Sequence, residues 1–78
     1  MNGSFVPEEQ ATISIFDRGF IFGDGVYEVV PVINGALVDK QYFLERLDYS
    51  LTELKIDWPC SKQAYIQVME QLVKRNQL

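Results

Sequence analysis

The stretch "ISIFDRGFIFGDGVYEVVPVINGAL", Ile13 to Leu37, decides how this 78-residue chain folds. It holds two apolar runs, separated by glycines at positions 19, 23 and 25. Because glycine interrupts regular elements, we expect residues 17–25 to be irregular or a short helical turn.

The glycines do not form a phosphate-binding loop. Their spacing, Gly-x-x-x-Gly-x-Gly, matches neither GxGxxG nor GxxxxGK[ST], and an expected strand follows them instead of a helix. A turn explains the glycines but not the apolar residues Phe20, Ile21 and Phe22 between them. We therefore expect this loop to pack against another surface.

The best strand signal follows the glycines. Residues 26–33, "VYEVVPVI", are rich in β-branched side chains and end at Asn34-Gly35, a strong hairpin signal. Residues 36–38 are the expected partner strand. Pro31 cannot donate to a ladder, so we expect an edge or a bulge there.

Two further strands are predicted near the N-terminus. Within residues 2–7 a short strand is expected after the Asn2-Gly3 turn, and it ends at Pro7. Residues 8–16 alternate, with Ala11, Ile13 and Ile15 on one side.

Two helices complete the expected fold, an α+β single domain over residues 1–78 in which both helices pack on one face of a small, mainly antiparallel sheet. Asp39 is the expected N-cap of a helix over residues 40–55, and Ser61 of a helix over residues 62–77. Apolar residues at helical spacing predict their buried faces: Leu44, Leu47, Leu51 and Leu54 with Phe43 on the first, and Tyr65, Ile66, Met69, Leu72 and Val73 on the second.

The composition excludes several classes of protein. The net charge is −4 without a basic patch, so we expect no nucleic-acid binding. Histidine is absent and Cys60 is the only cysteine, which leaves no metal-binding pattern. With no signal peptide and no membrane span in the sequence, we expect a cytoplasmic protein with no membrane partner. At 47% hydrophobic residues, the chain carries enough apolar side chains to cover a second surface.

The string "DRGFIFGDGVYEVVPVINGAL", followed by "FLERLDYSL", resembles the N-terminal part of the fold type IV pyridoxal-phosphate enzymes over about residues 2–56. These include D-amino acid aminotransferases, branched-chain aminotransferases and aminodeoxychorismate lyase. The "YEVV" ending is most similar to the D-amino acid branch; the other two branches more often have F-E-G or F-E-T there.

The resemblance implies roles for four residues. Arg46, in the helical "RL" motif, would contact the cofactor phosphate, which suits a guanidinium fork. Tyr27 would stand at the substrate side and, with Val29 and Pro31 on the same strand face, form part of the substrate wall. Without the resemblance, Arg46 is a surface arginine near Tyr42, Glu45 or Ser50, and Tyr27 a cross-strand packing residue.

Neighbouring residues have structural roles in this interpretation. Glu28 lies on the opposite strand face and needs a partner, for which Arg18 is the candidate. Asp24 forms the turn. Phe43 departs from the family pattern, in which histidine is common, and removes a polar group from the expected phosphate site.

The family's lysine that binds the cofactor covalently comes from a larger C-terminal domain. None of the four lysines, Lys40, Lys55, Lys62 and Lys74, matches it, so the chain contains no catalytic residue and all four are expected at the surface. The resemblance thus implies an N-terminal fragment of an enzyme that transfers amino groups between amino acids and 2-oxo acids. We expect it to be inactive alone, not to bind pyridoxal phosphate by itself, and to associate as a homodimer. Two alternatives stay open: a non-catalytic, self-associating module from a truncated gene, and a fragment of a branched-chain aminotransferase or an aminodeoxychorismate lyase.

Overall fold

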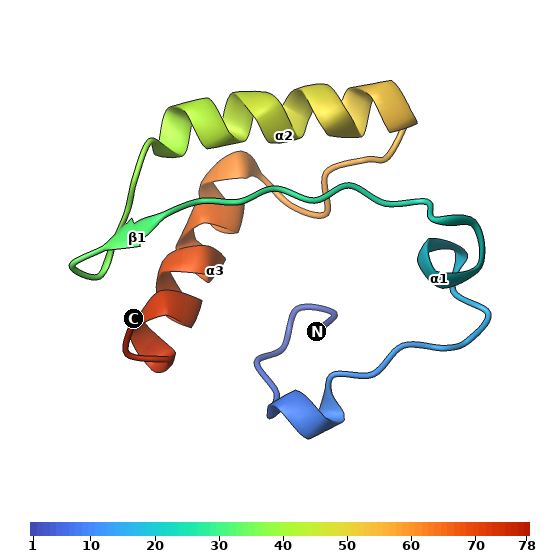
Figure 1. Ribbon diagram of the computed structural model, residues 1–78, viewed down its shortest axis with the longest axis horizontal. Coiled ribbons are helices and arrows are strands. Elements are labelled where there is room, and N and C mark those ends of the chain that lie inside the picture. The colour runs from blue at the N-terminus through green and yellow to red at the C-terminus, as the bar shows by residue number, and fades with distance from the viewer.

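The computed structural model describes residues 1–78 and has the predicted α+β composition, with two long helices and a small antiparallel sheet (Figure 1). None of its helices combines the length and apolarity needed to cross a membrane. In chain order the elements are the 3-10 helix η1 (Glu8–Gln10), helix α1 (Arg18–Phe22), strands β1 (Val32–Ile33) and β2 (Ala36–Leu37), helix α2 (Lys40–Leu54) and helix α3 (Lys62–Arg75).

Helix α2 supplies most of the core. Phe43, Leu47 and Leu51 recur at helical spacing and are buried, as predicted. Leu44 is half-buried, but Leu54 is 51% exposed, so the predicted stripe ends one turn early. Partly buried residues that pack against this row come from three other segments: Val26 and Val30 before the sheet, Ile56 and Trp58 after α2, and Tyr65, Ile66 and Met69 on α3.

The helix ends follow local chemistry with one exception. The Ser61 hydroxyl accepts a hydrogen bond from the Ala64 N–H at 3.1 Å, which confirms the predicted cap of α3. Asp39 is the N-cap residue of α2, as predicted, but its backbone is left-handed (φ 57°) and its side chain makes no capping hydrogen bond. Asp39 instead makes the sharp turn from β2 into α2, and aspartate tolerates this conformation better than most residues.

The predicted hairpin is confirmed. β1 and β2 pair antiparallel through Val32–Leu37 and Ile33–Ala36. Asn34 and Gly35 both have positive φ, 52° and 76°, as the favoured two-residue hairpin turn requires.

The segment between α1 and β1 is extended but unpaired, so the predicted strand over residues 26–33 is a strand only at 32–33. It runs beneath α2 along the helix (Figure 1). Burial alternates along it: residues 26, 28, 30 and 32 are half-buried and residues 27, 29, 31 and 33 exposed. This period of two is that of a strand with one covered face.

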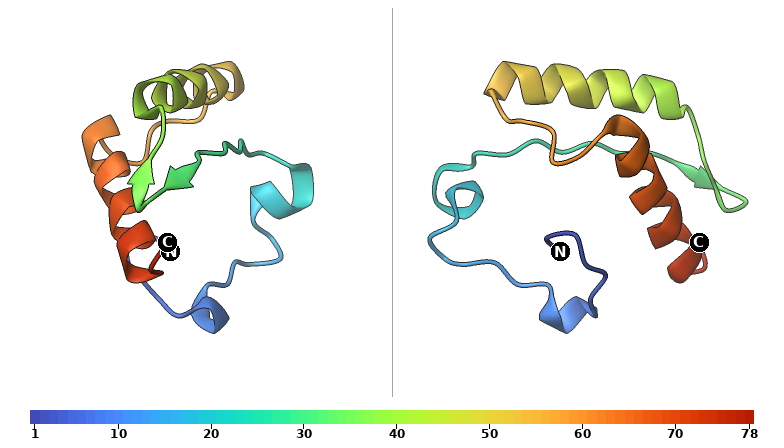
Figure 2. Two further views of the ribbon diagram at one scale, coloured as in Figure 1. Left: turned by 60° about the vertical axis from the view of Figure 1, so that its left-hand side comes forward. Right: turned by 180° about the vertical axis from the view of Figure 1, so that it is seen from behind.

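The two strands predicted before residue 17 are absent. η1 begins after Pro7, whose fixed φ suits a helical start, and the rest of the segment is irregular. Figure 2 shows this N-terminal part and α1 beyond the extended segment, on the side away from α2. Ile13 and Ile15, on the side expected to be covered, are 60% and 69% exposed, because no sheet lies against them.

A truncation in the core is expected to unfold much of the chain. Leu47→Ala removes a buried side chain from the central row and should lower the free energy of unfolding by about 2–4 kcal/mol. The matched control, Leu54→Ala at the exposed end of the same helix, should cost under about 1 kcal/mol. Urea denaturation followed by Trp58 fluorescence measures both; equal losses would contradict this core.

Candidate functional site

Arg46 ties helix α2 to the extended segment. Its Nε donates to Glu28 Oε2 at 3.0 Å and its Nη2 donates to the Val29 carbonyl at 3.2 Å. The guanidinium lies 5.1 Å from the centre of the Tyr42 ring, one turn earlier on α2. Arg46, the neighbour of buried Leu47, therefore extends its side chain along the edge of the helix to the extended segment.

The hydrogen bonds of Arg46 use one edge of its fork. Nε and Nη2 face the same side of a guanidinium, so Glu28 and the Val29 carbonyl together occupy that side. The end of the fork, formed by Nη1 and the second Nη2 hydrogen, keeps its donors for another acceptor. The arginine is thus fixed in orientation while a two-donor edge remains for a carboxylate or phosphate.

The predicted partner of Glu28 is wrong. Arg18 binds Asp24 at 2.6 Å, across the turn that ends α1, and stacks on Phe22 at 4.6 Å. Asp17 caps α1 by accepting from the Gly19 N–H at 2.9 Å, and α1 ends at Gly23 with a left-handed φ of 69°. Asp24 and Arg18 therefore hold the α1 loop together, while Glu28 belongs to Arg46.

Tyr27, Val29 and Pro31 share one face, as the alternation predicted, and that face is open. Tyr27 is 87% exposed and Val29 68% exposed. Their side chains point away from the helices, whereas Glu28 points toward them. A ligand that contacts both Arg46 and Tyr27 must therefore pass over the strand edge at which the Val29 carbonyl lies.

The depression around the Arg46 guanidinium has a volume of about 350 Å³ and is lined by Glu28, Tyr42, Glu45, Arg46, Tyr49 and Ser50. Three hydroxyls and the open fork offer donors to an anion. The two carboxylates outnumber the single cation, which opposes binding of a phosphate dianion. These residues can provide one contact, from Arg46, to the phosphate of pyridoxal phosphate. The rest of the positive charge that a phosphate needs must come from residues outside this depression.

Phe43 lies away from this site. It is the most buried residue of the chain, 3% exposed, and stacks on Tyr65 of α3 with ring centres 6.3 Å apart. Its side chain therefore belongs to the core between the two helices, and its effect on the phosphate site is indirect.

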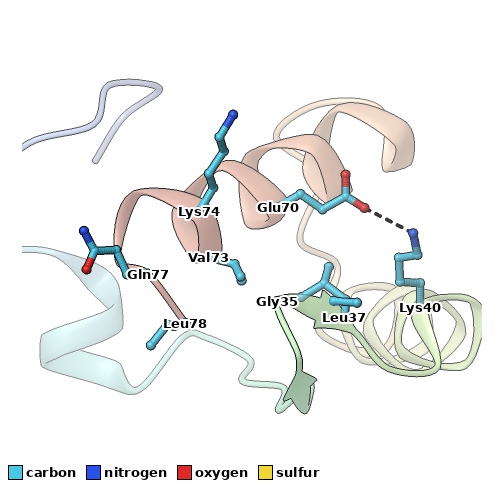
Figure 3. A pocket seen from close by; sticks show the side chains of 9 residues that line it. Gly35, Leu37, Lys40, Glu70, Val73, Lys74, Gln77 and Leu78 are labelled. Carbon is cyan, nitrogen blue, oxygen red and sulfur yellow. Dashed lines mark hydrogen bonds and ion pairs between the residues drawn. The ribbon is translucent and has the colours of Figure 1, made fainter.

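The four lysines are all exposed, as predicted. Lys40 and Lys74 line a depression of about 520 Å³ between the hairpin and the end of α3. Figure 3 shows Lys40 bound to Glu70, at 3.1 Å, and Lys74 pointing away from the hairpin. Lys62 contacts Asp48 at 3.7 Å and lies over Trp58. No lysine lines the depression around Arg46.

Comparison with known proteins finds relatives that the chain resembles over its whole length. The resemblance to the N-terminal part of a fold type IV aminotransferase is confirmed. The relatives are D-alanine aminotransferases: those of Staphylococcus aureus (strain N315) and Listeria monocytogenes (serotype 1/2a, strain 10403S) are 38% identical over all 78 residues, and that of Staphylococcus epidermidis (strain ATCC 12228) is 37% identical over 76. No protein-family model matches the chain.

The chain spans only about 28% of the length of these relatives. If 78 residues are 28%, the relatives are about 280 residues long (78/0.28), and about 200 of those residues have no counterpart here.

The pairing of Glu28 with Arg46 makes a measurable prediction. Glu28 is only 16% exposed in its side chain, so Glu28→Ala and Arg46→Ala should each lower the free energy of unfolding by about 1.5–3 kcal/mol. The double variant should cost less than the sum, because each single change leaves the other charge unpaired.

The control is the exposed pair of Arg18 and Asp24, whose side chains are 71% and 45% exposed. Alanine at either position should cost under about 1 kcal/mol. Additive losses at Glu28 and Arg46, in the same urea titrations, would show that the two side chains do not interact.

Proposed function

We propose that this chain is the cofactor-phosphate-binding and substrate-wall segment of a pyridoxal-phosphate-dependent aminotransferase that acts on D-amino acids. The observation that carries the proposal is Arg46, which Glu28 and the Val29 carbonyl hold with one edge of its guanidinium open. The names of the relatives support the substrate class.

Each residue has a separate part in the proposed reaction. Bound pyridoxal phosphate supplies an electrophilic carbon and an electron sink for carbanion chemistry. Arg46 binds the phosphate through its two free donors, which fixes one end of the cofactor. Tyr27 offers its hydroxyl to the amino acid carboxylate, and Val29 and Pro31 present an apolar wall to its side chain.

The proton transfers and the covalent attachment of the cofactor require a lysine that this chain does not place near Arg46. We therefore assign no catalytic residue within these 78 residues. A 2-oxo acid is the acceptor in the whole reaction, and a homodimer is the proposed assembly.

The reading frame after the codon for Leu78 distinguishes a segment of an enzyme from a stand-alone module. Sequencing beyond the codon for Leu78 should show an open frame of about 200 codons that encodes a lysine-bearing domain, since the relatives are longer by that amount. Purified protein of that length should transaminate D-alanine, but not L-leucine, and should leave aminodeoxychorismate unchanged. A stop codon directly after Leu78 favours the non-catalytic module, and turnover of L-leucine or aminodeoxychorismate favours another branch of the family.

The 78-residue chain alone should be inactive. Pyridoxal phosphate followed by borohydride should label no single lysine stoichiometrically, because all four are exposed and none faces the Arg46 depression. Peptide mass spectrometry and a D-alanine assay check this. Turnover that is lost when one of Lys40, Lys55, Lys62 or Lys74 is changed to alanine would overturn the assignment.

A further inference from the structure

Glu28 is the only charged residue between Gly25 and Ile33. Its side chain is 16% exposed and lies on the half-buried face of the extended segment, away from the open face that carries Tyr27. A carboxylate covered to this degree needs a partner, which the Arg46 Nε supplies at 3.0 Å. Glu28 therefore acts on Arg46 and not on a molecule that lies against Tyr27.

Core packing fixes the position of this carboxylate. Val26 and Val30, two residues before and two residues after Glu28, are half-buried and pack against the buried row of α2. In an extended chain these three side chains share one face, so the core holds the backbone of Glu28 from both sides. A side chain that is held in this way can orient a longer and freer side chain beside it.

The Arg46 guanidinium is held at one edge and on one face. Glu28 and the Val29 carbonyl, at 3.2 Å from Nη2, accept from the edge, and the Tyr42 ring lies against a face at 5.1 Å. A free arginine side chain has many rotamers, and a ligand that binds to it must overcome the loss of that freedom. Here much of the freedom is already lost on folding, which favours later binding at the open edge.

The second carboxylate of the depression has no such role. Glu45 is exposed, accepts from the Gln41 Nε2 at 3.3 Å one turn earlier on α2, and forms no ion pair with Arg46. Glu45 therefore adds negative charge beside Arg46 without orienting it. The two carboxylates make it possible to measure the effect of charge and the effect of orientation separately.

We propose that Glu28 is a positioning residue for the cofactor phosphate: it holds the Arg46 guanidinium so that both free donors of the fork bind the phosphate together. The inference rests on the proposed function of Arg46 as a phosphate contact. Glu28 itself touches neither cofactor nor substrate. It acts through the orientation of Arg46, as carboxylates that orient the ligands of a metal site do.

Two pairs of side chains at position 28 isolate orientation from charge. Glu28→Gln keeps an acceptor of the same length, whereas Glu28→Ala removes it, and the two variants have the same charge. The wild-type protein and Glu28→Asp also share one charge, but aspartate is one methylene shorter. Because Val26 and Val30 hold the segment in place, the shorter carboxylate should not reach the Arg46 Nε.

The affinities for pyridoxal phosphate and for pyridoxal, which lacks the phosphate, test the proposal in the protein encoded by the complete reading frame. Equilibrium dialysis gives both dissociation constants, and their ratio reports the contacts to the phosphate alone. The preference for pyridoxal phosphate should fall by about threefold or more from Glu28→Gln to Glu28→Ala, and from the wild-type protein to Glu28→Asp. A merely structural role of Glu28 would weaken both ligands equally and leave the ratio unchanged.

Two control variants separate the possible results. Glu45→Gln should not lower the preference, because Glu45 orients nothing, and Arg46→Ala should lower it more than any change at Glu28. Equal preferences within either pair, with Arg46→Ala still impaired, would overturn the positioning role and leave the phosphate contact of Arg46 standing. An unchanged preference in Arg46→Ala, or a reading frame that ends at Leu78, would overturn both.

Discussion

The buried row of Phe43, Leu47 and Leu51 along α2 is the constraint on which the rest of the structure depends. Only one other residue of the chain, Val73, is buried to the same degree. Since Val26 and Val30 pack on this row, the extended segment can turn only its even-numbered residues toward the helices. Two consequences follow: Tyr27 must face outward, and Arg46, next to Leu47, lies at the strand edge where it can reach Glu28.

The sequence predicts the elements whose signals are local. The two long helices, the Ser61 cap and the Asn34-Gly35 turn were all predicted, because helical spacing, a capping hydroxyl and tolerance of positive φ each act within a few residues. The period of two over residues 26–33 correctly gave the two faces of the segment.

Strand pairing and ion pairs between residues far apart in the sequence could not be predicted from local signals. Alternation at Ala11, Ile13 and Ile15 shows that a segment is able to form a strand, but a strand also needs an edge to pair with, and this chain provides none there. Glu28 had two arginines within reach along the sequence, Arg18 and Arg46. Arg18, the nearer one, pairs with Asp24 within its own loop. Glu28 therefore pairs with Arg46, 18 residues further along the chain, which packing of α2 on the extended segment brings close.

Glu28 fixes the orientation of the Arg46 guanidinium, but it also weakens the binding of an anion there. A carboxylate on the side of the fork fixes the guanidinium plane, which pre-organises the two remaining donors and reduces the entropy lost when an anion binds. The same carboxylate neutralises the charge of Arg46, so the pair as a whole offers an anion no net positive charge. A hydrogen bond to a charged group contributes only about 1.5–3 kcal/mol. An anion at Arg46 therefore needs further positive charge, and a site built in this way binds firmly only when other residues complete it.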